Sequence, residues 1–147
     1  MDRQIKLFPF FSKIAWIIYL VATLSACQLV ATFDEGALNQ SYKVQQDLSI
    51  LYQMLADTPD NERTYDKFQR EYIRVQVGLT NLLKRHEARK KNEETIKATK
   101  TLTELLIKYQ DAHKQKNSYK AALIKVHNKR LSSLMEKVVQ AEELKRR

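Results

Sequence analysis

Apolar residues recur in the middle of the chain at the three- and four-residue spacing that places side chains on one face of an α-helix. The most regular run lies between residues 65 and 86, where this spacing continues without a slip. We therefore predict a long amphipathic helix in this region. Its buried stripe is expected to consist of Tyr65, Phe68, Tyr72, Val75, Leu79, Leu82 and His86.

The segment before this stripe contains a turn signal at residues 57–61. Thr58 is a candidate N-cap, Pro59 suits the first position of a helix, and the acidic Asp60 favours the positive end of the helix dipole. We predict that the long helix runs from Pro59 to about residue 91, roughly 50 Å at 1.5 Å per residue. A shorter helix is predicted over residues 37–56, with a stripe of Leu48, Leu51, Tyr52 and Leu55.

The helical stripe does not continue beyond His86. Extending the same phase would bury Arg89, Glu93 and Lys100, which are poor core residues. We therefore predict a turn near Asn92, which can cap a new helix led by Glu93. A polar break at residues 114–118 precedes a last helix. The expected stripes of these two helices are Ile96, Thr99, Leu102, Leu105, Leu106, Tyr109 and His113, then Ile124, His127, Leu131, Leu134, Val138 and Ala141.

Four amphipathic helices joined by short links predict an all-α fold, an antiparallel helical bundle with coiled-coil-like packing. The composition agrees, because two glycines and two prolines are too few for the turns of a β-sandwich or barrel. Gly78, inside the most regular helix, suggests a close approach between helices. The helix from residue 59 would be longer than its neighbours, so a homodimer through a protruding coiled coil is one hypothesis.

The first 27 residues carry the pattern of an export signal. Basic residues, among them Arg3 and Lys13, precede an apolar run from Ile14 to Leu24. A basic start, an apolar run of about 7 to 15 residues and a small-residue end are the parts of a secretory signal peptide. The pattern ends in Leu24, Ser25, Ala26 and Cys27, the last of which is the only cysteine of the sequence.

This tetrad resembles the lipobox of bacterial lipoproteins, in which an aliphatic residue and two small residues precede a cysteine. The resemblance implies that Cys27 is lipidated, that the chain is cut just before it, and that the lipid anchors the protein to a membrane. It divides the chain into a signal peptide (1–26), a lipidated tether (27–36) and a helical bundle domain (37–147). Gln28 is not the aspartate that retains such lipoproteins in the inner membrane, so the resemblance favours the periplasmic face of the outer membrane. The alternative is an uncleaved signal anchor, because residues 14–33 carry no charge over 20 positions.

The chain is basic, with a net charge of +9, but the charge is unevenly distributed. Residues 27–80 contain five basic and eight acidic residues, whereas residues 81–147 contain eighteen basic and eight acidic ones. Two arrangements fit this division. Acidic helices could pack against basic ones, or the second half could present a basic surface to an anionic lipid or an acidic envelope protein. Nucleic acid is not expected as a partner of an exported, tethered protein.

The three histidines are the main candidates for cofactor chemistry. His86, His113 and His127 fall on or beside the predicted stripes, where a helical bundle can hold a metal or haem. Their expected heights along the bundle differ, which argues against one shared site. Met54 and His127 could be combined as a haem ligand pair, but any helical stripe offers such pairs by chance. We therefore expect no metal site and no cofactor.

Catalysis is not expected either. The acid pairs Glu93-Glu94 and Glu142-Glu143 diverge by about 100 degrees on a helix, so we interpret them as helix-end charges. The sequence contains neither a phosphate-binding glycine loop nor a nucleophile motif. We expect a non-enzymatic binding or scaffold component of the cell envelope, with a partner in secretion, conjugation or a phage-related system. The alternative is a periplasmic carrier or sensor for a small ligand, a metal or haem.

Overall fold

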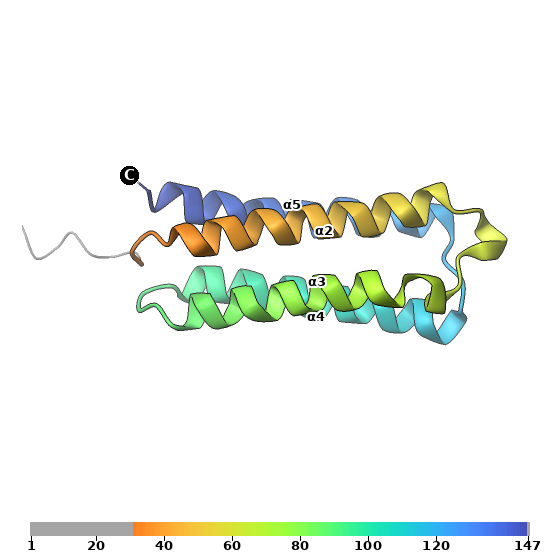
Figure 1. Cartoon of the computed structure of the whole chain (residues 1–147), viewed down its shortest axis with the longest axis horizontal. Coiled ribbons are helices and arrows are strands. Elements are labelled where there is room, and N and C mark those ends of the chain that lie inside the picture. Colours follow the sequence, from red (N-terminus) through yellow and green to blue (C-terminus); the bar gives the residue numbers. More distant parts are fainter. Residues whose placement is uncertain (1–30, 147) are drawn as a thin grey trace, which may run out of the picture. The chain divides into compact units, whose positions relative to one another are not determined.

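The computed structural model describes residues 31–146, which form four α-helices (Figure 1). Each helix runs antiparallel to the next one along the chain, so the predicted all-α antiparallel bundle is confirmed. The helices are α2 (Glu35–Asp57), α3 (Tyr65–Glu87), α4 (Glu93–Lys116) and α5 (Ala121–Leu144), with a short 3-10 turn, η1 (Asp60–Glu62), before α3.

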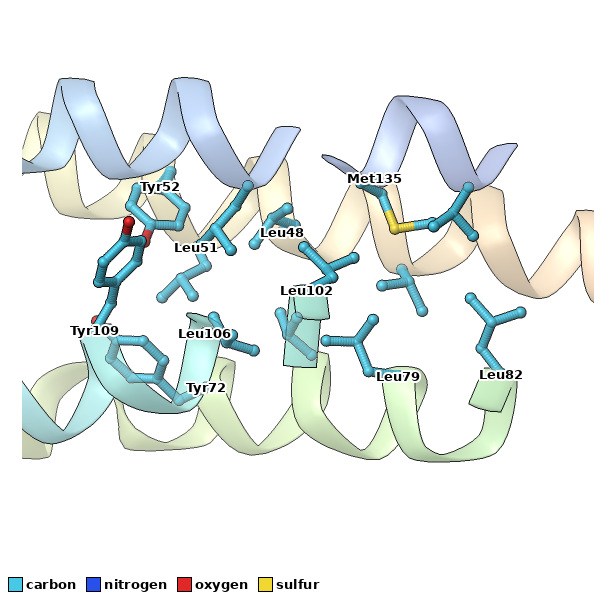
Figure 2. Close-up of a cluster of buried hydrophobic side chains, with 14 of the residues drawn as sticks. Leu48, Leu51, Tyr52, Tyr72, Leu79, Leu82, Leu102, Leu106, Tyr109 and Met135 are labelled. Carbon is cyan, nitrogen blue, oxygen red and sulfur yellow. The ribbon is translucent and has the colours of Figure 1, made fainter. Parts of the chain in front are cut away.

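The core lies between the four helices and consists mainly of leucine and tyrosine side chains (Figure 2). α2 packs against α3 and α5, and α4 packs against the same two helices. The stripes predicted for the first two helices are confirmed, because every member is buried. The largest fully buried side chains include Tyr52, Tyr72, Phe68, Leu48, Leu51, Leu55, Leu79, Leu82, Leu102, Leu106, Leu131 and Met135.

The turn between α2 and α3 differs from the prediction. Thr58 does not begin a helix: it ends α2, and its hydroxyl donates a hydrogen bond back to the Met54 carbonyl at 2.8 Å. Pro59 precedes η1, and α3 begins only at Tyr65. The backbone amide of Tyr65 donates instead to the side chain of Asn117, in the turn between α4 and α5, at 2.9 Å. A tertiary contact therefore supplies the cap that local sequence assigned to Thr58.

The late start of α3 also corrects its length. The helix has 23 residues, as α2 has, and α4 and α5 have 24 each. At 1.5 Å per residue these are all about 35 Å long. The four described helices differ in length by at most one residue, so the structure removes the reason for placing a homodimer contact at a protruding end.

Two residues with left-handed backbone mark the remaining turns, and neither is a glycine. Lys91 has a φ of 59° between α3 and α4, and Asn117 has a φ of 44° at the end of α4. Asn92 stands at the predicted N-cap position, but its side chain makes no cap bond to α4. It donates to the His86 carbonyl at 2.9 Å and so binds the end of α3. The last break lies at residues 117–120 rather than 114–118, because α4 continues to Lys116 and α5 begins at Ala121.

The bundle begins earlier than the predicted boundary at residue 37. Asp34 caps α2 by accepting a hydrogen bond from the Ala37 amide at 3.1 Å, and Phe33 packs against the core. The amide of Ala31 donates to the Lys91 carbonyl at 3.0 Å. Residues 31–36, which the lipoprotein interpretation placed in the tether, therefore belong to the bundle. The signal peptide and the lipobox residues Leu24, Ser25, Ala26 and Cys27 lie outside the described residues.

Within residues 31–146, none of the helices has the length and apolar character needed to cross a membrane.

Gly78 permits the close helix approach that its position suggested. A Cβ atom there would lie 2.8 Å from a methyl group of Val44 on α2, and the Gly78 carbonyl accepts a hydrogen bond from Gln40. The backbones of α2 and α3 therefore meet closely at this point.

Candidate functional site

His86 is separated from the other two histidines, which both pack on Tyr119. His86 lies near the end of the bundle where α3 gives way to α4. His113 and His127 lie toward the other end, on either side of Tyr119, with ring centroids 4.9 and 5.6 Å from that of the tyrosine. In the described part of the chain, no three His, Cys, Asp or Glu side chains are grouped so that they could hold a metal ion.

His86 belongs to a buried polar cluster, which we call the end cluster and define as His86, Arg89, Asn92, Glu142 and Lys145. The Arg89 guanidinium donates to His86 Nδ1 at 2.7 Å, so this nitrogen accepts and the proton of the neutral ring is on Nε2. Nε2 has no hydrogen-bond partner among the described residues. Burial, and then the charge of Arg89, lower the pKa of His86 to about 4. The ring is therefore neutral at physiological pH.

Glu142 is the centre of this cluster, although we interpreted it from the sequence as a helix-end charge. Its carboxylate is fully buried and accepts hydrogen bonds from Arg89 at 3.0 Å and Lys145 at 2.8 Å. The backbone amide of Asp34 also donates to it, at 3.1 Å. Burial alone would raise the pKa of Glu142, but these hydrogen bonds lower it below its ordinary value. The neighbouring Glu143 is exposed, so the predicted divergence of the pair is confirmed.

The end cluster has a structural role. It links the segment before α2, the turn between α3 and α4 and the end of α5 through one carboxylate. Both Lys145 and Arg89 are almost buried, and the Asn92 side chain accepts from Lys145. Because every charged member faces an opposite charge, the cluster leaves no cation directed at a ligand. It fastens this end of the bundle.

The histidines at the other end are also held by hydrogen bonds. The Arg63 carbonyl can only accept, so His113 Nε2, 2.9 Å away, must donate to it. His113 Nδ1 then accepts from the Tyr72 hydroxyl at 3.1 Å. His127 stacks on Tyr109 with the ring centroids 3.5 Å apart. Both nitrogens of His113 are thus occupied by the fold.

A haem pair formed by Met54 and His127 does not match the structure. Met54 is 39% exposed on α2 rather than in the core. His127 Nδ1 is hydrogen-bonded to the Tyr119 hydroxyl, and the ring is covered by Tyr109. These two side chains are therefore not presented to a common ligand.

The α5 stripe departs from the prediction, and the departure exposes a groove. Met135 is fully buried where we expected Leu134, and Glu142 where we expected Ala141. Leu134 is only half-buried, as is Leu105 on α4. These two leucines lie between α4 and α5 in the floor of a surface groove.

We call this feature the α4–α5 groove. Its volume is about 730 Å³. Charged side chains surround its apolar floor, and Val126, which is 59% exposed, extends that floor along α5. The lining residues are Thr101, Glu104, Leu105 and Lys108 from α4, and Val126, Lys129, Arg130, Ser133, Leu134 and Lys137 from α5.

The groove is strongly basic. Four of its lining residues are cations and one is a carboxylate, Glu104. None of the four cations forms an ion pair with any residue that the structure describes. The cationic side chains are Lys108, Lys129, Arg130 and Lys137.

The ion pairs show how far the charges of the two halves of the chain meet directly. Six pairs lie wholly within residues 31–146. Only one, Asp34 with Arg85, joins an acid of residues 27–80 to a cation of residues 81–147. The acidic-half helix α2 does pack against the basic-half helix α5. Close ion pairs between the two halves nevertheless neutralise little of the positive charge of the second half. It remains on the surface, in part around the groove.

The comparisons with known proteins leave the site to be judged on its geometry. A scan against protein-family models and searches of curated proteins and of solved structures gave no match.

Proposed function

We propose that this chain is a lipid-anchored, non-enzymatic binding component of a bacterial cell envelope. The α4–α5 groove is the observation that supports binding: it combines a half-buried apolar floor with four cations that lack counterions within the described residues. Leu105, Leu134 and Val126 leave a contiguous apolar strip partly exposed in this groove, which suits the face to a ligand or partner.

Neither buried polar network supplies the geometry of an enzyme site. Each nitrogen of His113 bonds a group of the fold, and the Glu142 carboxylate is occupied by Arg89 and Lys145. A general acid or base must reach the proton it transfers on a substrate. These groups are directed at one another, which favours a structural role for both networks.

Anchoring is proposed from the resemblance of residues 24–27 to a lipobox. Cys27 precedes Ala31 by four residues, so a lipid on Cys27 would be joined by a short linker to the end of the bundle that contains the end cluster. The groove lies along the side of the bundle, between α4 and α5. A protein held in this way would keep the groove open to a partner in the same compartment. The absence of an aspartate after Cys27 supports the periplasmic face of the outer membrane as its location.

Mass spectrometry of the protein purified from bacterial membranes tests the anchor. We expect a mature N-terminus at Cys27 with a diacylglyceryl thioether on its sulfur, and loss of this species in the Cys27→Ser variant. An intact Met1 with an unmodified Cys27 thiol would contradict the anchor.

The binding function is tested separately. The full chain is extracted in detergent, and the envelope proteins that co-purify with the wild type but not with a variant of the groove are identified.

A further inference from the structure

We propose that the α4–α5 groove binds an amphipathic helix of a partner protein, with apolar residues on one face and acidic residues on its flanks. This inference rests on the proposed binding function and specifies the chemistry of the partner. The groove is formed by two antiparallel helices, and a third helix can pack in the space between two such neighbours. An amphipathic helix in a hydrophobic groove is a common mode of recognition.

The dimensions of the groove fit a short stretch of helix. Its lining runs from Val126 to Lys137 on α5 and from Thr101 to Lys108 on α4. At 1.5 Å per residue, the α5 side corresponds to about 16 Å, or three turns. A partner helix would place two or three apolar side chains at three- and four-residue spacing on Leu105, Leu134 and Val126.

The positions of the cations fit acidic flanks. The stack of Tyr109 on His127 sets the antiparallel register of α4 and α5, which places Lys108 opposite Asn128 and within one residue of the height of Lys129. These two lysines and Arg130 therefore surround one end of the groove. Lys137 lies eight residues from Lys129, about 12 Å further along the axis. The complementary helix carries an acidic cluster at one end and a further acid about two turns away.

Other ligands fit the groove less well. A flat bilayer surface cannot reach leucines on the floor of a groove. A small molecule is usually enclosed and oriented by a few precisely placed polar groups, whereas the polar groups here are mainly long, flexible cations on the rim. Repeated positive charge along an apolar groove matches a ligand with repeated negative charge, which an acidic amphipathic helix provides.

The test uses a synthetic peptide of about 18 residues, with leucines at three- and four-residue spacing and glutamates on the flanks. The full-length chain is placed in phosphatidylcholine nanodiscs, and binding of the labelled peptide is followed by fluorescence anisotropy, with empty nanodiscs as the blank. We expect saturable binding, and at least tenfold weaker binding of a scrambled peptide with the same composition. The groove variant, Lys129→Glu with Arg130→Glu and Lys137→Glu, should bind the peptide at least tenfold more weakly than the wild type.

A matched control variant changes the same amount of charge elsewhere: Lys43→Glu, Arg70→Glu and Lys90→Glu, all at exposed positions. It should change the affinity less than threefold. A peptide with lysines in place of the glutamates should bind the groove variant better than it binds the wild type. The Ser133→Trp variant fills the groove without changing its charge and should also weaken binding at least tenfold. Circular dichroism verifies that each variant is folded.

Several results would overturn the proposal. Absence of saturable peptide binding, or an equal loss in the control and groove variants, would exclude a helix-binding groove. Binding of dihexanoyl phosphatidylglycerol to the wild type but not to the groove variant, without peptide binding, would assign the groove to anionic lipid. Self-association of the wild type that is abolished by Ser133→Trp would assign it to a second copy of the chain. Each result leaves the mass-spectrometric test of the lipid anchor unaffected, so the two proposals can fail independently.

Discussion

Lowering the pH from 7 to 5 is expected to destabilise the bundle through His86. In the folded chain its pKa is about 4, because burial disfavours the charged ring and Arg89 donates to the nitrogen that would take up the proton. In the unfolded chain the ordinary value is near 6.5. The unfolded state therefore binds a proton first as the pH falls. Stability is unaffected by this group above about pH 7 and is lost progressively between pH 6.5 and 4.

The two pKa values of His86 set the size of the effect. For a group with a pKa of 6.5 when unfolded and about 4 when folded, the free energy of unfolding falls by about 2 kcal/mol when the pH is lowered from 7 to 5. At pH 5 an ordinary glutamate is still mostly ionised, so the end-cluster carboxylate contributes little in this interval. The interval from pH 7 to 5 thus isolates histidine from carboxylate titration.

The His86→Asn variant separates this group from the other histidines. Asparagine keeps an acceptor for Arg89 but does not titrate. Urea unfolding of the full chain in a neutral detergent, followed by circular dichroism at 222 nm, gives the unfolding free energy at pH 7 and pH 5. The wild type should lose about 2 kcal/mol more than His86→Asn over this interval, since His113 and His127, whose pKa values are also lowered by burial, titrate in both proteins. Equal losses in the two proteins would refute the assignment.

Three other substitutions test the packing by urea unfolding at pH 7. Gly78→Ala should destabilise the wild type by about 1 kcal/mol, because the added Cβ would meet Val44. In a Val44→Ala background the same substitution should stabilise the protein by about 1 kcal/mol, because alanine favours a helix more than glycine does. The same sign in both backgrounds would contradict the close approach. Arg63→Met should cost about 2 to 3 kcal/mol, since Arg63 donates to the carbonyls at the end of α2, and a loss below 0.5 would contradict this role. Glu142→Gln should cost about 3 kcal/mol because it leaves two nearly buried cations without their counter-charge, and a neutral result would show that the cluster does not fasten the bundle.

The sequence predicted the helices where burial and periodicity coincide. The stripe from Tyr65 to His86 is buried as predicted, because three- and four-residue steps leave only one face for the core. The sequence predicted the turn after α3 because the three- and four-residue repeat of apolar residues would place Arg89 in the core. No glycine marks this turn. The left-handed residue there is Lys91, which carries no local signal for a turn.

The ends of the helices could not be predicted where tertiary contacts decide them. Thr58 and Pro59 form a common start signal, yet the chain continues α2 to Asp57 and delays α3 to Tyr65. Arg63 explains part of this difference. Its guanidinium donates to the carbonyls of Leu55 and Ala56 at the end of α2, and such a bond depends on the three-dimensional course of the turn.

The groove could not be predicted because both helices that form it contain adjacent apolar residues. Leu105 precedes Leu106 and Leu134 precedes Met135, and each member of a pair fits a helical stripe nearly as well as the other. The structure buries Leu106 and Met135 and leaves the other two at the edge of the interface. Packing of the whole bundle decides which member is left over.

The α4–α5 groove combines two features that folding alone does not favour. Leu105 and Leu134 keep part of their apolar surface in water, which sacrifices hydrophobic stabilisation. Three cations lie around one end of the same groove without ion-pair partners in the described chain, so solvent and salt screen much of their mutual repulsion. In contrast, the end cluster pairs every buried charge. Local features that reduce stability without a structural gain are typical of functional sites, and a partner with an acidic, apolar helix would remove both costs at once.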